Sequence, residues 1–183
     1  PFRPASPYAV SKVAEDMLAF QYWLSWKIKT IRTRMFTHTG PRRGEVFAES
    51  SFAKQIAAIE SGAQEPVIKV GNLDSVRTFL DIKDAVRAYW LLVTKCPPGE
   101  VYNIGGVETM TVGEMLQKLL NLSTVKTIEV KVDPARLRPS DVTLQIPSTE
   151  KFREATGWKP EIRFDQTLRD LLNFWRDYFK KNA

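Results

Sequence analysis

A tyrosine and a lysine four residues apart, near the amino end of the chain, have the spacing of a proton-transfer pair. Tyr8 and Lys12 stand in the run Ser-Pro-Tyr-Ala-Val-Ser-Lys, and a helical pattern begins after Pro7. Residues four apart on a helix share one face. A lysine ammonium beside a phenol stabilises the phenolate, which lets Tyr8 exchange a proton with a sugar hydroxyl or ketone near neutral pH. The alternative is an exposed tyrosine beside an ordinary surface lysine, and this spacing alone does not decide between them.

Other residue types that carry chemistry are scarce. His38 is the only histidine and Cys96 the only cysteine. A histidine metal cluster and an internal disulfide are therefore not expected, and a Ser-His-Asp triad is disfavoured. We predict no metal site, and we expect His38 to contact a ligand or to be structural.

The chain is basic, with 27 lysines and arginines, 21 acidic residues and a net charge of +6. This balance indicates an anionic partner. Nucleic acid is disfavoured because the arginines are scattered through structured segments instead of forming a stripe with stacking aromatics. A phosphorylated small molecule fits better. No apolar run has the roughly 18 residues of a membrane helix, and Pro1–Pro4 lacks the core of a signal peptide, so we expect no membrane partner and a cytoplasmic protein.

Hydrophobic periodicity predicts helices alternating with strands. Helices are expected over about 8–29, 48–61, 83–96, 111–120, 148–156 and 165–178, and strands over about 30–36, 66–70, 74–81, 101–104 and 127–132. This alternation is typical of βαβ units and predicts an α/β fold. The first helix is expected to bury one broad apolar face, Thr111 and Glu114 form a predicted capping box, and Asp165 is a predicted cap.

Two loops have the composition of ligand sites. Residues 37–45 contain His38 and the run Gly-Pro-Arg-Arg-Gly, and loops at strand ends are where α/β folds place ligands. Residues 133–141 carry Arg136 and Arg138 between prolines, so their guanidiniums can bind a diphosphate or carboxylate, or the loop can be a solvated linker. The spacing leaves both open. Gly105 and Gly106 lack the lysine and hydroxyl partners of a phosphate-binding loop and predict a turn.

Taken in order, these motifs resemble the extended short-chain dehydrogenase/reductase enzymes that act on nucleotide sugars. The matching runs are Ser6–Lys12, Gly40–Glu45, Val70–Arg77, Asp81–Asp84, Val101–Gly105, Arg138–Asp141 and Thr156–Pro160. Within that family the chain is most similar to GDP-mannose 4,6-dehydratase and GDP-4-keto-6-deoxymannose reductase. The run Pro-Arg-Arg-Gly-Glu is like the dehydratase, whereas Phe52–Ile56 and Asp133–Arg136 are more like the reductase.

The resemblance implies a fold and the part of that fold that residues 1–183 contain. It implies the C-terminal part of a Rossmann-type doubly wound sheet plus a smaller α/β substrate-binding domain, with the N-terminal dinucleotide-binding half absent from residues 1–183. The cofactor is NAD or NADP, left undecided because the residue that selects between them belongs to that half. A homodimer or homotetramer is expected.

The resemblance also implies roles for particular residues. The catalytic residues are Tyr8 and Lys12; cofactor contacts come from Tyr8, Lys12, His38 and Arg43; and substrate contacts come from Thr37, Lys54, Arg77, Arg138 and Asp141. Many relatives have Asn at the position of Thr37. The implied reaction converts GDP-mannose to GDP-4-keto-6-deoxymannose by internal hydride transfer. A GDP-4-keto-6-deoxymannose reductase, another nucleotide-sugar epimerase and a non-catalytic GDP-sugar-binding fragment are the alternatives, and the isolated chain is expected to be inactive.

Overall fold

The computed structural model describes residues 2–137 and 142–182. Its helices are α1 (Pro7–Trp26), α2 (Ala48–Glu60), α3 (Ile82–Lys95), α4 (Val112–Asn121), the short 3₁₀ helix η1 (Pro134–Arg136), α5 (Glu150–Thr156) and α6 (Phe164–Lys181). Its strands are β1 (Arg32–Met35), β2 (His38–Thr39), β3 (Val67–Val70), β4 (Val76–Thr78), β5 (Leu80–Asp81), β6 (Val101–Ile104), β7 (Thr109–Thr111), β8 (Glu129–Val132) and β9 (Leu144–Gln145). The predicted α/β class is confirmed.

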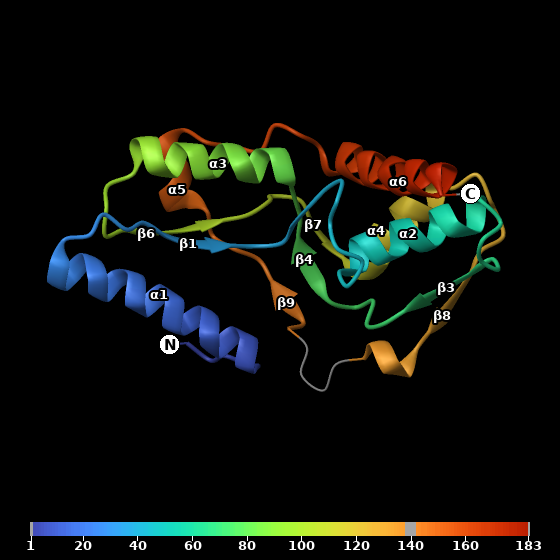
Figure 1. Ribbon diagram of the computed structural model, residues 1–183, viewed down its shortest axis with the longest axis horizontal. Helices are drawn as coiled ribbons and strands as arrows, with labels where there is room; N and C mark the ends of the chain where they lie inside the picture. Colours follow the sequence, from blue (N-terminus) through green and yellow to red (C-terminus); the bar gives the residue numbers. More distant parts are fainter. Residues whose placement is uncertain (1, 138–141, 183) are drawn as a thin grey trace.

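One end of the molecule is a three-layer unit around a short parallel sheet. Strands β1 and β6 pair in parallel, from Arg32 opposite Val101 to Met35 opposite Ile104. Helix α1 lies on one side of this sheet and helices α3 and α5 on the other (Figure 1). The buried side chains between the sheet and these two helices include Ala88, Leu92, Tyr102, Ile104, Phe152 and Trp158. Helices on both faces of a parallel sheet are the Rossmann-type arrangement.

The other end is a smaller unit with its own core. Helices α2, α4 and α6 pack together beside the parallel pair β3 and β8 (Figure 1). A mixed sheet in the order β7-β4-β9 lies between the two units. The core of the smaller unit is large, and it includes Phe52, Ile56, Ile68, Met115, Leu119, Leu168, Leu171 and Leu172.

Two buried carboxylates join the two units. Asp81 caps α3 by accepting from the Lys83 backbone N–H at 2.8 Å, and it also accepts from the Thr167 hydroxyl of α6 at 2.7 Å. Asp84, in the first turn of α3, accepts from the backbone N–H groups of Glu161 and Ile162 at 3.0 and 2.9 Å. In the sequence, the motif Asp-x-x-Asp indicated only a family resemblance. In the structure, its two carboxylates bind α3 to α6 and to the segment that precedes α6.

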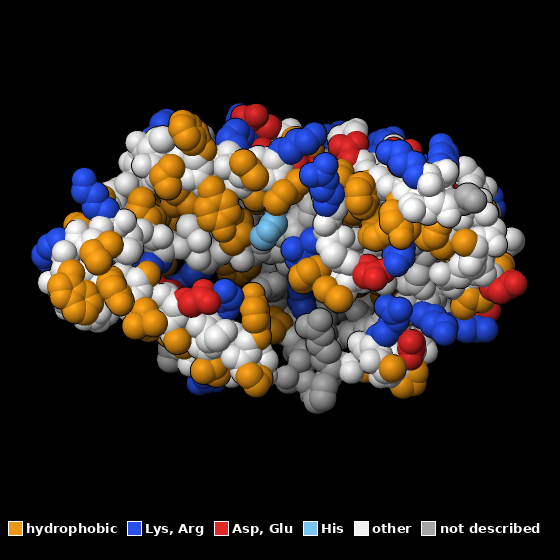
Figure 2. All heavy atoms as spheres, viewed as in Figure 1, with side chains coloured by type: hydrophobic (Ala, Val, Ile, Leu, Met, Phe, Trp, Pro, Cys, Tyr) orange, Lys and Arg blue, Asp and Glu red, His pale blue; other side chains and the backbone are white. Residues whose placement is uncertain are grey.

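The expectation of a buried face on α1 is wrong. No residue of this helix is buried, and Leu18, Leu24 and Trp26 are 56–60% exposed. The reason is that, in the part of the chain that the structure describes, β1 is the one helix or strand that packs extensively against it. The helix is held instead by polar contacts, in which the Asp16 carboxylate accepts from Arg32 at 3.0 Å and from Arg34 at 2.8 Å. Figure 2 shows the apolar side chains that remain at the surface over α1.

Local details agree with some capping predictions and correct others. The capping box is confirmed, because the Thr111 hydroxyl accepts from the Glu114 backbone and Glu114 accepts from that of Thr111. The prediction of Asp165 as a cap is wrong, since Arg163 occupies the cap position and Asp165 pairs with Lys118 at 2.7 Å. Strands β2, β7 and β9 were not predicted, and β4 and β5 were predicted as one strand over 74–81. No helix in residues 2–137 and 142–182 has the length and apolar character of a membrane span.

Candidate active site

Tyr8 and Lys12 lie on one face of α1, as their spacing predicts. The helix begins sharply because Pro7 occupies its first turn and the Ser6 hydroxyl accepts from the Ala9 backbone N–H at 3.1 Å. The Lys12 ammonium lies 5.7 Å from the centre of the Tyr8 ring. Tyr8 is 71% exposed, so its hydroxyl is open to a ligand. The Glu15 carboxylate, 2.8 Å away, raises the pKa of Lys12 above its ordinary value.

The pair lies at the end of the sheet where ligands are expected. The amino end of α1 is on the same side as the carboxyl ends of β1 and β6, near β9 (Figure 1). In open α/β sheets the crevice outside the carboxyl ends of the strands is the usual ligand site. The predicted residues Thr37 and His38 follow directly from β1 into this region.

Gln145 connects two predicted substrate residues. The Thr37 hydroxyl lies 3.4 Å from the Gln145 side-chain oxygen and donates to it. Gln145 also pairs with Arg77 in the register of β9 on β4. The Arg77 guanidinium donates to the Val76 carbonyl at 3.0 Å. Sequence reasoning missed Gln145, because a two-residue strand following a long loop has too little periodicity to be recognised.

His38 is half-buried at the start of β2, which pairs with β5. Its Nδ1 lies 3.1 Å from the Phe36 carbonyl oxygen. A carbonyl only accepts, so this contact requires a proton on Nδ1, and it leaves Nε2 as the atom available to a ligand.

The loop after β2 turns sharply and folds Arg43 inward. The Arg43 backbone N–H donates to the Gly40 carbonyl, and Arg42 has a φ of 71°, a strained left-handed conformation for a residue with a side chain. The Arg43 guanidinium lies 3.3 Å from the centre of the Phe47 ring. It is also 3.6 Å from Glu49 in the first turn of α2. In this conformation Arg43 contacts its own chain, and its cofactor contact stays a prediction.

Glu49 is a buried carboxylic acid beneath this loop. Only 4% of the residue is exposed. Its Oε1 atom, the Thr39 hydroxyl and Arg43 Nε are buried and have no hydrogen-bond partner. Burial raises the pKa of Glu49, and the opposing effects of its own backbone N–H and of Arg43 are smaller. This residue was not singled out from the sequence, since one glutamate in a helix carries no signal of burial.

Replacing Glu49 with glutamine is expected to stabilise the protein above neutral pH. Because the folded state holds the Glu49 proton to a higher pH than the ordinary 4.5, stability falls as the pH rises through the raised pKa. Glu49→Gln removes that loss, and we expect a gain of about 1 kcal/mol at pH 8, the scale of one poorly satisfied buried group. Thermal unfolding at pH 5 and pH 8 measures it. An equal effect at both pH values would contradict this account, and the control is Glu154→Gln, at an exposed position on α5.

Lys54 is engaged within its own unit. Its ammonium forms an ion pair with Glu45 and lies 5.3 Å from the centre of the Trp175 ring. It therefore links the loop to α2 and α6, and a substrate contact remains a prediction. Arg138 and Asp141 lie outside the described residues.

The parallel sheet with helices on both faces, and the exposed Tyr-x-x-x-Lys pair at its carboxyl end, define an extended short-chain dehydrogenase/reductase. More narrowly, residues 1–171 match the family described as GDP-mannose 4,6 dehydratase, and the chain belongs to that family.

Curated relatives include enzymes of two activities. The chain is 35% identical over 172 residues to a GDP-6-deoxy-D-mannose reductase of Pseudomonas aeruginosa, covering 94% of this chain and 56% of that protein. It is 27% identical over 199 residues to a GDP-mannose 4,6-dehydratase of Yersinia enterocolitica, covering 94% and 53%. The chain thus spans about half the length of the curated relatives it matches.

Solved structures give the same picture. The structure of RMD from Pseudomonas aeruginosa complexed with NADPH superimposes with a TM-score of 0.89 at 33% identity, covering 96% of this chain and 58% of that one. A dTDP-glucose 4,6-dehydratase from Bacillus anthracis in complex with NAD gives a TM-score of 0.82 at 26% identity, covering 98% and 55%.

Proposed function

We propose that this chain is the C-terminal half of a nucleotide-sugar dehydratase that converts GDP-mannose to GDP-4-keto-6-deoxymannose. The observation that carries the proposal is the exposed Tyr8–Lys12 pair at the carboxyl end of a Rossmann-type sheet, in a chain of the GDP-mannose 4,6-dehydratase family.

Tyr8 is the proposed acid–base residue. Its exposed hydroxyl takes the proton of the sugar 4-hydroxyl as the carbon beneath it is oxidised, and returns a proton when a ketone is reduced. The Lys12 ammonium, 5.7 Å from the centre of the Tyr8 ring, stabilises the phenolate that forms between these steps. The base that removes the C5 proton before water leaves C6 is not among the residues assigned here.

A nicotinamide cofactor supplies hydride acceptance and donation when bound. The free faces of Tyr8 and Lys12 fit the edge of its ribose, because both side chains are exposed on one side of α1. His38 Nε2 is a further contact. Arg43 completes the proposed cofactor contacts, and in the structure its guanidinium lies against Phe47 and Glu49.

The substrate diphosphate is assigned to Arg77, with Arg138 as its proposed partner. Guanidinium groups bind phosphate oxygens through paired, charge-assisted hydrogen bonds. Thr37 and Gln145 lie next to Arg77 through the β4–β9 register and supply hydroxyl and amide contacts for the sugar or ribose. Lys54 and Asp141 complete the proposed substrate contacts.

The surfaces of the three-layer unit support a missing nucleotide-binding half. Within the described ranges, β1 pairs only with β6, so its other edge is unpaired. Val86, Trp90 and Val93 of α3 are 60–70% exposed, and three apolar residues of α1 are 56–60% exposed. Parallel sheets are normally larger and covered on both faces. We therefore propose that further strands continue the sheet at β1, with helices packed against α1 and α3.

The test of the function is the product formed by the full-length protein. Given GDP-mannose and catalytic cofactor, a dehydratase yields a product lighter by one water, which mass spectrometry detects. Residues 1–183 alone are the control, and they are expected to give no turnover. Unchanged GDP-mannose with the full-length protein would refute the dehydratase assignment.

The second candidate is a GDP-4-keto-6-deoxymannose reductase. It is favoured by the relative named GDP-6-deoxy-D-mannose reductase, which is 35% identical to this chain. The same assay separates the two, because a reductase consumes the keto sugar together with reduced cofactor and leaves GDP-mannose unchanged.

A further inference from the structure

A pocket lies on the side of β4 opposite the proposed substrate residues. It has a volume of about 380 Å³, and it is lined by β4, β7, the segments after β6 and β9, and the start of α5. Thr78 is in this lining, whereas Arg77 precedes it on the strand. Successive side chains of a strand point to opposite faces, so the pocket and Arg77 lie on different faces of β4.

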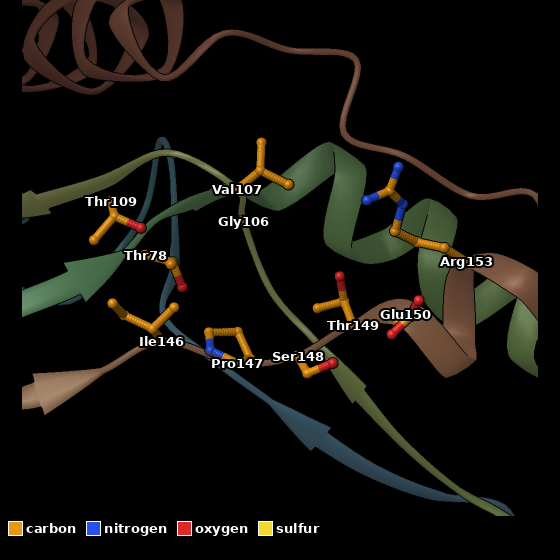
Figure 3. A pocket seen from close by; sticks show the side chains of 10 residues that line it. All are labelled: Thr78, Gly106, Val107, Thr109, Ile146, Pro147, Ser148, Thr149, Glu150 and Arg153. Carbon is orange, nitrogen blue, oxygen red and sulfur yellow. The ribbon is translucent and has the colours of Figure 1, made fainter.

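The pocket contains a buried hydroxyl that the fold does not use. Thr78 is 2% exposed, and its Oγ1 atom has no hydrogen-bond partner. A buried hydroxyl without a partner is costly, and such groups are rare in folded proteins. Thr149 gives a second observation: it occupies the cap position of α5, yet its side chain makes no capping hydrogen bond. Figure 3 shows Thr78 and Thr149 among the side chains that surround this space.

The backbone shapes the pocket through a glycine. A Cβ on Gly106 would lie 1.8 Å from the Phe79 carbonyl oxygen, so only glycine lets this segment pass so close to the end of β4. Glycine is therefore needed at position 106 because the backbone passes close to Phe79, and not because φ is positive there. Val107 follows it at the rim of the pocket and, with Ile146 and Pro147, contributes an apolar wall.

The charges of the lining indicate what class of ligand fits. Glu150 contributes one carboxylate and Arg153 one guanidinium, so the charged groups of the lining balance. A ligand with several charges of one sign would be repelled by one of these two side chains. A neutral ligand with several hydroxyl groups satisfies both, because each hydroxyl donates and accepts, and it also offers partners to Thr78 and Thr149.

We propose that this pocket binds a neutral, polyhydroxylated small molecule of monosaccharide size. The volume, about 380 Å³, lies in the range of small-molecule sites and holds a single sugar ring. The site does not depend on the proposed reaction, because none of its lining residues belongs to the proposed catalytic or substrate set.

The test is binding of D-mannose and D-glucose to the full-length protein, measured by saturation-transfer NMR with GDP present in excess. GDP occupies the proposed substrate site and leaves the pocket free. We expect affinity of about millimolar for at least one sugar. Absence of binding, or displacement of the sugar by GDP, would overturn the proposal.

Two substitutions locate the binding. Thr78→Val keeps the volume and removes the unpartnered hydroxyl, so we expect affinity to fall about tenfold with an unchanged or higher melting temperature. A lower melting temperature would mean that the hydroxyl is structural, which contradicts the proposal. Arg153→Gln is expected to weaken binding several-fold, whereas Arg169→Gln on α6 leaves it unchanged. Sugar binding that neither pocket substitution alters would also contradict it.

Discussion

Replacing Tyr8 with phenylalanine in the full-length enzyme is expected to lower turnover about a thousandfold, within the range that a positioned acid–base group contributes. The hydroxyl is the only atom removed, and its exposed position on α1 gives the ring no packing to lose. Binding of GDP should stay within about twofold, because the proposed diphosphate contacts come from Arg77 and Arg138 and not from Tyr8. Steady-state kinetics and GDP titration measure the two quantities.

The matched control is Tyr22→Phe, which removes the same atom from the same helix at a residue that is 44% exposed. Its turnover is expected to equal that of the unmodified enzyme. If Tyr8→Phe kept turnover within a few-fold, Tyr8 would not be the acid–base residue. If instead it lost GDP binding, the hydroxyl would serve the substrate site and not the chemistry.

Replacing Asp84 with alanine is expected to destabilise the chain by about 2–3 kcal/mol, the scale for losing hydrogen bonds to a buried charged group. Asp84 is 2% exposed. Its carboxylate accepts from two backbone N–H groups and from the Arg87 guanidinium at 2.6 Å. The substitution removes the acceptor of the two N–H groups and frees the segment between α5 and α6 from α3.

Urea denaturation measures this loss as a lower midpoint with an unchanged slope. Asp177→Ala, at an exposed position on α6, is the control and should change stability by less than about 0.5 kcal/mol. A loss below about 1 kcal/mol for Asp84→Ala would show that the carboxylate is not needed to join the two units.

The local elements were largely predictable from the sequence. The periodic apolar residues of 48–61 and the Thr111–Glu114 capping box act within a few residues, so their structure follows from neighbouring side chains. That Tyr8 and Lys12 lie on one face was also predictable from the sequence, because residues four apart share a face in any helix. The motifs that carried the family resemblance were likewise readable in order along the chain.

Burial was not predictable where the partner is distant in sequence. The apolar residues of α1 have the pattern of a buried face, yet none is buried, since periodicity states which residues share a side and not what covers it. Glu49 is the converse case: an ordinary helical glutamate becomes a buried acid because the loop carrying Arg43 folds over it.

The sequence by itself determined the helices, most of the strands, the Tyr8–Lys12 spacing and the family. Only the tertiary structure decided that Asp84 joins two units and that Gln145 links Thr37 to Arg77. It also decided that Thr78 lines a pocket and that its hydroxyl has no hydrogen-bond partner. These relations connect residues tens of positions apart, and the short strands that align them have too few side chains for their pairing to be read from pattern alone.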